Sequence, residues 1–155
     1  VFEQAGAATQ GRFGQFTASL LQPIEPTARG TLSVTVDLVS LATGDTQRDS
    51  LLRGVDLFDV AKHPKAQFNV AKLAPAQQGR LMLDGVLTLR GVSKRLAIPA
   101  TLQPDVTAKP RTVILQGETT LNRLDFGIGQ GEWKSTEWVA NAVKVRFTLR
   151  FVAVK

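Results

Sequence analysis

The chain has 155 residues, the length of one domain, and it contains no cysteine, which excludes disulfides, thiolate nucleophiles and thiolate metal sites. Its formal net charge of +6 suits nucleic acid, anionic lipid or an acidic protein as a partner, but the lysines and arginines are scattered, which disfavours nucleic acid. No membrane-spanning run of about 18 apolar residues is present. The start resembles no signal peptide, so we expect a cytosolic protein or one whose signal has been removed.

Apolar and polar side chains alternate along most of the chain, which is the pattern of half-buried β-strands. The predicted strands are a short stub at 1–2, then 11–22, 31–39, 66–73, 80–91, 95–103, 112–122 and 143–155. Gly14 and Gly85 indicate a bulge or a close backbone approach, and Pro99 suits an edge or a bulge. About eight strands separated by turn signals predict an all-β antiparallel barrel or sandwich, in a single domain over 1–155.

One segment, near 46–62, has helical spacing instead. Its first residues, 46–49, resemble a capping box, and Gly54 and Pro64 are placed to end one or two short helices. We expect Asp49 to act as a cap and Asp59 to lie on a helix face. In a barrel, such an insertion typically covers one mouth.

The glycine-rich stretch "LDFGIGQGEW" at 124–133 contains the letters of a kinase metal-binding motif, but the accompanying kinase motifs are missing. Its glycines are spaced G-x-G-x-G, which is not the dinucleotide fingerprint. The stretch is therefore predicted to be a strand that runs into a tight bend, where glycine permits positive φ or leaves room for Trp133.

Catalytic and metal-binding patterns are weak. His63 is the single histidine, it precedes Pro64 in a polar turn, and no G-x-S-x-G motif is present. No enzymatic activity and no metal are expected. A small-molecule hydrolase or isomerase with a barrel-mouth site around His63 remains the catalytic alternative.

The predicted barrel has a size at which the interior is either filled or holds one small ligand. Most inward positions are Leu, Val or Phe, which favour a filled core. Small residues at Ala18, Gly85, Ala100 and Gly117 leave space instead. The residues alone therefore leave both a ligand-binding barrel and a ligand-free interaction module open.

Six segments in order resemble one family. They are "GRFGQFTASL" at 11–20, "SLATGDTQRDSLL" at 40–52, "LFDVAKHPKAQF" at 57–68, "LDGVLTLRGVSK" at 83–94, "NRLDFGIGQGEW" at 122–133 and "VKVRFTLRF" at 143–151. Over nearly its whole length the chain resembles the YceI-like family of periplasmic, lipocalin-like, polyisoprenoid-binding proteins. Its ending is similar to a branch associated with diheme b-type membrane cytochromes. The chain departs from the family by beginning inside the first strand, and by Leu57 at an often aromatic position.

The resemblance implies an extended eight-stranded, lipocalin-like barrel around a long apolar tunnel. The implied ligand is a long-chain isoprenoid or related lipid: a polyprenyl phosphate, an isoprenoid quinone or a fatty amide. The resemblance also implies a periplasmic protein with its signal peptide removed, and no cofactor besides the lipid. An anionic membrane surface and a membrane cytochrome are the expected further partners. Transport, storage and sequestration stay open, as does a homodimer.

Site residues follow from the alternation and the resemblance together. The tunnel-lining candidates are Phe13, Phe16, Val34, Val36, Leu38, Phe68, Leu87, Leu89, Leu121, Phe126, Val145 and Phe147. Leu51, Leu52 and Phe58 are expected to cover the mouth, with Trp133 and Trp138 as rigid walls near the head group. Arg48, His63 and Arg123 are the head-group candidates, because an anionic or quinone head needs donors at the rim.

Each of these residues also has a purely structural interpretation. The apolar candidates could be ordinary core residues. Arg48 could instead pair with Asp59, and Arg123 with Asp125.

Overall fold

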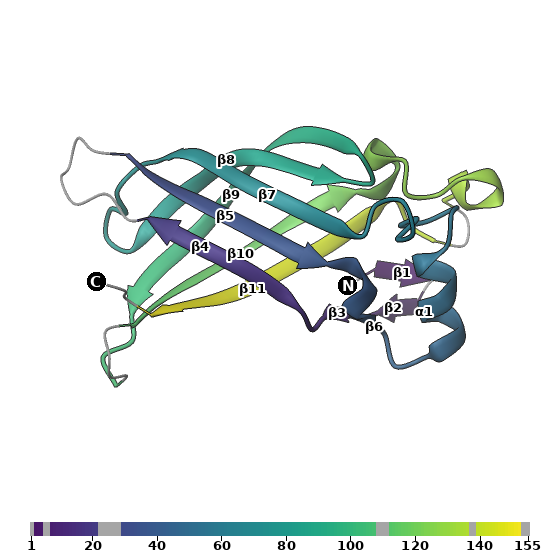
Figure 1. Cartoon of the computed structure of the whole chain (residues 1–155), viewed down its shortest axis with the longest axis horizontal. Helices are drawn as coiled ribbons and strands as arrows, with labels where there is room; N and C mark the ends of the chain where they lie inside the picture. The colour runs from purple at the N-terminus through teal and green to yellow at the C-terminus, as the bar shows by residue number, and fades with distance from the viewer. Residues whose placement is uncertain (1, 5–6, 22–28, 108–111, 137–138, 153–155) are drawn as a thin grey trace.

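In the computed structural model of the chain, one curled antiparallel sheet of seven strands forms most of the molecule (Figure 1). The structure describes residues 2–4, 7–21, 29–107, 112–136 and 139–152. The strands follow the spatial order β11 (Ala142–Val152), β10 (Thr112–Asn122), β9 (Val92–Pro104), β8 (Arg80–Leu89), β7 (Lys65–Leu73), β5 (Gly30–Asp37) and β4 (Phe16–Leu21). The predicted all-β, barrel-type fold is confirmed, although the seven strands form a half-barrel rather than a closed eight-stranded one.

The shorter elements gather at one end of the sheet, on the right of Figure 1. They are the hairpin of β1 (Phe2–Gln4) and β2 (Ala7–Thr9), the pair of β3 (Arg12–Phe13) and β6 (Leu41–Ala42), the helix α1 (Thr46–Arg53) and the 3-10 turns η1 (Leu38–Ser40), η2 (Arg123–Phe126) and η3 (Gly131–Lys134). We call this the helix end of the half-barrel.

The strand predicted at 11–22 is divided into β3 and β4. The break falls at Gly14 and Gln15, whose backbone N–H groups donate to the carbonyl (3.4 Å) and the hydroxyl (3.0 Å) of Ser40. Beyond the break, β4 pairs with β5, whereas β3 pairs with β6. The suspected irregularity at Gly14 is therefore a change of pairing partner.

The helical insertion is shorter than predicted and is capped differently. The side chain of Asp45 is the N-cap, because it accepts from the N–H groups of Gln47 (3.0 Å) and Arg48 (3.1 Å). The predicted capping box at 46–49 is wrong, since Asp49 accepts instead from the N–H and hydroxyl of Thr43, at 2.9 and 2.5 Å. The helix ends before Gly54, as expected.

The second part of the insertion, 54–62, consists of turns. The N–H groups of Leu57 and Asp59 both donate to the carbonyl of Gly54, at 3.1 and 2.8 Å. Asp59 is buried and has a positive φ of 50°, so its predicted place on a helix face is wrong. A left-handed residue interrupts the regular hydrogen-bond pattern that a second helix would need.

Two clusters of buried side chains hold the sheet curled. One lies in the sheet away from the helix end and contains Leu32, Val70, Leu73, Leu83, Ile98, Ala100, Leu115 and Leu149. The other lies at the helix end and contains Leu38, Leu57, Val60, Ala66, Leu89, Phe126 and Ile128. Burial of a large aliphatic side chain contributes about 1.5–3 kcal/mol, so these clusters supply much of the stability.

Gly85 allows a close approach inside the sheet, as predicted. A Cβ there would collide with the carbonyl oxygen of Asn69 and lie 3.0 Å from the ring of Phe68. Any side chain at Gly85 would therefore push β7 and β8 apart.

Pro99 lies in β9, opposite Met82 of β8. The ladder between β9 and β10 runs from Pro104 opposite Val113 to Ala100 opposite Gly117 and ends one residue short of Pro99. Proline has no N–H to contribute to a ladder, which fits this position at its end. β9 is a central strand, but at Pro99 it is paired on one side only, with β8. The prediction that Pro99 lies at an edge holds in this local sense.

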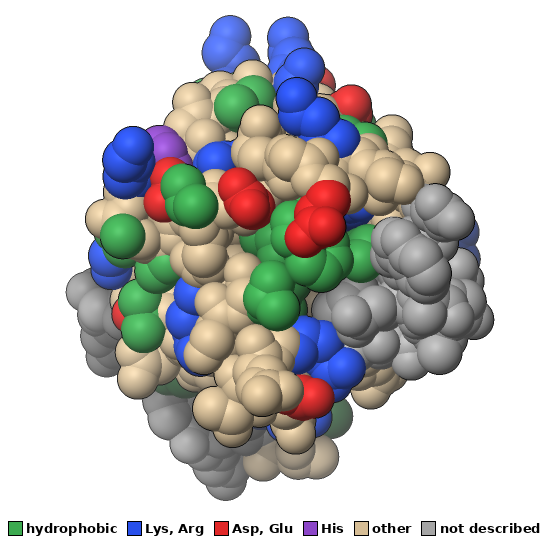
Figure 2. Space-filling model, turned by 90° about the vertical axis from the view of Figure 1, so that its right-hand side faces the viewer, with side chains coloured by type: hydrophobic (Ala, Val, Ile, Leu, Met, Phe, Trp, Pro, Cys, Tyr) green, Lys and Arg blue, Asp and Glu red, His purple; other side chains and the backbone are tan. Residues whose placement is uncertain are grey.

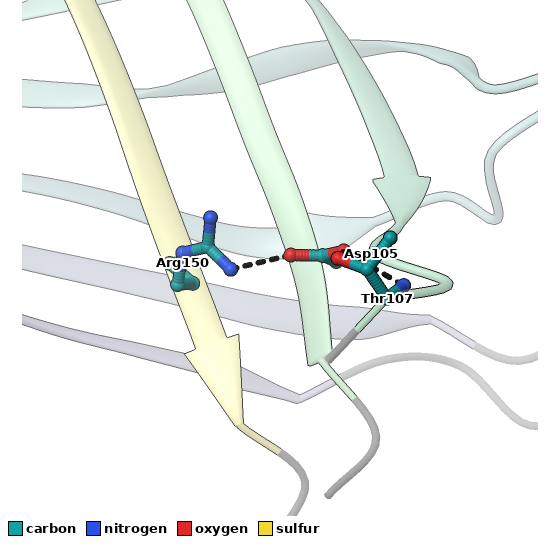
Figure 3. A network of polar contacts seen from close by, with 3 residues as sticks. All are labelled: Asp105, Thr107 and Arg150. Carbon is teal, nitrogen blue, oxygen red and sulfur yellow. Dashed lines mark hydrogen bonds and ion pairs between the residues drawn. The ribbon is translucent and has the colours of Figure 1, made fainter. Parts of the chain in front are cut away.

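At the opposite end of the sheet, a small polar network ties the connection after β9 to β11 (Figure 3). The Asp105 carboxylate accepts from the N–H and hydroxyl of Thr107, at 3.1 and 2.7 Å, and pairs with the Arg150 guanidinium at 2.5 Å. These contacts, first those of Thr107 and then that of Arg150, hold the pKa of Asp105 below its ordinary value of 3.8.

Candidate ligand-binding site

The inner face of the half-barrel keeps accessible apolar surface between the two buried clusters. The register places Val34 opposite Phe68 and Phe68 opposite Leu87, so their side chains point to the same face. The half-buried members of this inner face are Val34, Val36, Phe68, Leu87, Leu121, Val145 and Phe147, all predicted tunnel-lining residues. In a fully packed interior such side chains would lose nearly all their exposure. Their partial exposure therefore leaves apolar surface open to solvent on this face.

The sheet has two edges, which bound this surface. β4 and β11 are the two edge strands, and no ladder joins them among the described residues. Phe16 belongs to the inner-facing set because it lies opposite Val36, and it is 49% exposed. The predicted tunnel residue Phe16 thus lies on the edge strand β4, with about half of its surface exposed.

Several predicted lining and mouth residues meet at the helix end. Phe13 and Phe58 form an edge-to-face pair with ring centroids 6.0 Å apart. Leu52 and Trp133 are half-buried and pack against the same cluster, whereas Leu51 is 49% exposed. The insertion therefore covers this end of the sheet, with Leu51 facing outward.

Three predicted lining residues are core residues in this structure. Leu38 and Phe126 are 2% and 4% exposed, and Leu89 is 8% exposed. They pack in the buried cluster at the helix end and offer little surface to a ligand. Trp138 lies outside the described residues.

Arg48 and His63 occupy different environments at the helix end. The Arg48 guanidinium donates to the hydroxyl (2.9 Å) and the carbonyl (3.2 Å) of Thr43, and among the described residues it forms no ion pair with Asp59. His63 is half-buried, and its ring lies close to Gly91, where a Cβ would come within 3.0 Å.

Arg123 holds the loops of the helix end together. Its Nε donates to the Ala140 carbonyl at 3.0 Å, and its two terminal nitrogens each donate to two further carbonyls. These four carbonyls belong to Ile128 (2.9 Å), Trp133 (2.7 Å), Ser135 (3.1 Å) and Val139 (2.9 Å).

A guanidinium has five N–H donors, so Arg123 has none left for a head group or for the predicted alternative partner, Asp125. The residue is 4% exposed, and this burial lowers the pKa of its guanidinium. We therefore leave Arg123 out of the proposed head-group site and assign it a structural role.

Two further arginines, which the sequence did not single out, have the same role. Arg53 donates to the carbonyls of Val39 (3.2 Å) and Leu41 (2.6 Å), and Arg90 donates to those of Val55 (2.6 Å) and Gly127. No local pattern indicates these contacts, because their acceptors are backbone groups that lie 12 to 37 positions away.

The glycine-rich stretch supplies two of the five carbonyls that Arg123 binds, those of Ile128 and Trp133. Gly127, Gly129 and Gly131 have positive φ values of 71°, 124° and 60°, which confirms the predicted bend. The predicted strand before them is wrong, because β10 ends at Asn122 and a 3-10 turn follows. The stretch is a structural loop rather than a phosphate-binding one.

Figure 2 shows hydrophobic side chains exposed near the middle of the helix end, with acidic and basic side chains around them. Leu51 and Val55, which are 49% and 61% exposed, belong to this end of the molecule. Among the described residues, no helix has the length and apolar character needed to cross a bilayer.

The curled antiparallel sheet and the helix that covers one end of it define a lipocalin-like, barrel-type fold. The sequence pattern that defines the YceI-like domain matches residues 2–151 of the chain. The chain therefore belongs to the YceI-like family. This finding confirms the family resemblance seen in the sequence.

Curated relatives share part of their length with the chain. A UPF0312 protein of Shewanella oneidensis is 37% identical over 122 residues, which cover 76% of this chain and 63% of the relative. A UPF0312 protein of Vibrio campbellii is 34% identical over 91 residues, or 59% of this chain and 48% of the relative. The matched part of the chain thus spans about half to two-thirds of these relatives.

Solved structures agree with the fold over nearly the whole chain. BcnA of Burkholderia cenocepacia has a TM-score of 0.88 at 30% identity and covers 98% of this chain and 93% of its own. A YceI protein of Campylobacter jejuni has a TM-score of 0.83 at 21% identity, with 96% and 87% covered. A polyisoprenoid-binding domain of Saccharophagus degradans has a TM-score of 0.75 at 17% identity, with 99% and 91% covered.

Proposed function

We propose that the protein binds a long-chain isoprenoid or related lipid on the apolar inner face of its half-barrel, without chemical conversion of the lipid. The observation that carries this proposal is the band of half-buried Leu, Val and Phe side chains between the two buried clusters. The Saccharophagus degradans neighbour is described as a polyisoprenoid-binding domain, which supports the same ligand class.

Burial of the tail supplies the affinity. Each methylene group removed from water contributes about 0.8 kcal/mol, so a long chain binds tightly without specific polar contacts. We place the polar head at the helix end, where Arg48 and His63 remain the candidate donors and Trp133 is a wall of the mouth.

We further propose a periplasmic location, because YceI-like proteins are generally periplasmic. Carriage or storage of the lipid, contact with an anionic membrane surface and exchange of an isoprenoid quinone with a membrane cytochrome all fit a basic protein with an apolar interior.

The catalytic alternative, a hydrolase or isomerase around His63, lacks a supporting observation. A catalytic histidine is normally oriented by a hydrogen bond from a second group. Among the described residues the His63 ring has no such partner, and no group of three metal-binding side chains is present. The interior of the half-barrel therefore remains the proposed site.

Native mass spectrometry of the purified protein, followed by lipid extraction, tests the proposal directly. The matched variants are Leu87→Trp, which narrows the interior, and Val86→Trp, which places the same ring on the outer face of the same strand. We expect Leu87→Trp to weaken binding of the isoprenoid alcohol solanesol at least about tenfold and Val86→Trp to leave it unchanged. Absence of any bound or acquired isoprenoid in the wild type would refute the proposal.

A further inference from the structure

The outer wall of the half-barrel carries a groove of about 890 Å³, on the opposite side of the sheet from the proposed lipid surface. Four neighbouring strands, β8 to β11, and the turn before β8 line it. The outward-facing side chains at the groove are those of Arg80, Met82, Pro99, Thr101, Gln116, Glu118, Arg146 and Thr148. The groove is shallow and largely open to solvent, so a ligand in it would lie against the sheet with one side exposed.

The groove lies where the ladder between β9 and β10 ends. Beyond Ala100 opposite Gly117 the two strands are no longer paired, and Ala100, Gly117 and Phe147 all reach the groove. A Cβ on Gly117 would lie only 2.5 Å from the ring of Phe147, so this ring covers the inner side of the wall. A single layer of backbone therefore separates the groove from the interior.

The charges around the groove do not balance. Strands β8 to β11 and the residue that follows β9 carry three carboxylates, and each has a cationic partner: Asp84 with Arg95 at 3.4 Å, Glu118 with Lys144 at 3.5 Å and Asp105 with Arg150 at 2.5 Å. Two arginines on the outer face of these strands, Arg80 and Arg146, are exposed and form no ion pair among the described residues, although Glu118 lies directly opposite Arg146 in the register. Both line the groove.

The two guanidinium groups lie on opposite sides of a floor that is apolar at Met82 and Pro99 and polar at Thr101, Gln116 and Glu118. The outer row of the sheet runs from Arg80 through Thr101 and Gln116 to Thr148, and Arg146 lies two residues from Thr148 along β11. Three strand spacings of about 4.8 Å put the two arginines roughly 15 Å apart. Met82 and Pro99 lie on the floor between them, with Met82 54% exposed.

We propose that this groove is a second binding site, separate from the interior, for a single-chain anionic amphiphile such as an alkyl phosphate. Arg80 or Arg146 binds the anionic head, because a guanidinium forms bidentate hydrogen bonds with a phosphate or carboxylate. The chain lies across Met82 and Pro99. Free single-chain acids and single-chain lipid phosphates share this chemistry.

The test is a two-dimensional ¹H–¹⁵N NMR titration of the full chain with dodecyl phosphate below its critical micelle concentration. We expect saturable shifts of the Met82, Thr101, Gln116 and Glu118 amides, which line the groove. Dodecanol and inorganic phosphate, which supply the chain and the head separately, should bind at least about tenfold more weakly. Dodecanoate replaces the phosphate head with a carboxylate and shows which source of anion binds better.

The variants compare free with paired arginines on the same face. Arg80→Gln and Arg146→Gln should each weaken dodecyl phosphate binding, and the double variant should weaken it at least about tenfold. Arg95→Gln, which removes an arginine already paired with Asp84, should not. Solanesol binding by the double variant should equal that of the wild type. The experiment therefore tests the outer groove independently of the proposed lipid site on the inner face.

Two results would overturn the second site. One is equal affinity for dodecyl phosphate in the double variant and in Arg95→Gln. The other is a set of shifts confined to inward-facing residues such as Val36 and Leu87, together with loss of binding in Leu87→Trp. Retained amide spectra in each variant show that it is folded.

Discussion

Arginine side chains at the helix end act mainly as cross-links between backbone segments. Arg123 alone connects the region after β10 with both sides of η3 and with the residues that lead into β11. Because its acceptors are carbonyls rather than carboxylates, these contacts do not depend on the ionisation of a partner. The loops around the proposed mouth are thereby held in one arrangement.

Replacement of Arg123 by alanine should destabilise the protein by about 3–5 kcal/mol, since five buried or part-buried carbonyls would lose their donor. Thermal unfolding followed by circular dichroism should show a drop in Tm of about 10 °C. The control is Arg95→Gln, which removes an exposed ion pair and should cost at most about 1 kcal/mol. Similar losses in the two variants would contradict the role given to Arg123.

The Asp105 network makes part of the stability depend on pH. The pKa of Asp105 in the folded protein lies below 3.8, so its ionised form stabilises the fold above that pH, and this contribution disappears as pH falls through the lowered value. Asp105→Ala should therefore cost more at pH 6 than near pH 2, as measured by urea unfolding. A destabilisation that is the same at both pH values would show that the charge of Asp105 is irrelevant.

Among the elements, the loop from η2 to η3 shows how glycine geometry and an arginine act together. Gly129 has a φ of 124°, and a Cβ there would collide with the Arg123 guanidinium and lie 2.6 Å from the Trp133 carbonyl oxygen. Gly131 also has a positive φ, 60°, but nothing lies within 4 Å of its Cβ position. Both positions therefore need glycine for its positive φ, but only Gly129 also lacks the space for a side chain.

Gly129→Ala should cost at least about 3 kcal/mol, because both strain and collision apply, whereas Gly131→Ala should cost about 1–2 kcal/mol for backbone strain alone. Urea unfolding of the two variants, side by side with the wild type, measures the difference. Equal costs would mean that the loop shifts freely to accept a side chain at Gly129.

Most elements could be predicted because they depend on local pattern. Alternation placed the long strands to within a few residues, and Gly54 ended the helix where expected. The capping box and the second helix failed because Asp49 is drawn to Thr43 and Asp59 is held at positive φ, both through tertiary contacts. The break in the strand predicted at 11–22 likewise depends on Ser40, which lies far away in sequence.

At the scale of the whole molecule, a net charge of +6 is combined with an apolar inner face. Positive charge attracts the protein to anionic bilayers, at about 1 kcal/mol for each nearby Lys or Arg. The proposed lipid would then be exchanged at the membrane surface.

Transfer of solanesol from phosphatidylglycerol vesicles to the protein should accordingly be at least about tenfold faster than from neutral vesicles at low ionic strength. This difference should vanish between roughly 0.01 M and 1 M salt, as the Debye length falls from about 30 Å to about 3 Å. Stopped-flow measurement with a fluorescent isoprenoid gives both rates. Rates that are independent of lipid charge would argue for transfer through solution.

The sequence alone determined the all-β fold, the inward and outward sets of side chains and the family, because alternation and ordered motifs are local properties. It also named the residues of the accessible inner face, such as Val36, Leu87 and Val145. Only the tertiary structure decided which candidates are core, as Leu38 and Phe126 are, and that Arg123 serves carbonyls from several segments. Burial and hydrogen-bond partners depend on which distant groups the curled sheet brings together. The sequence around a residue does not contain that information.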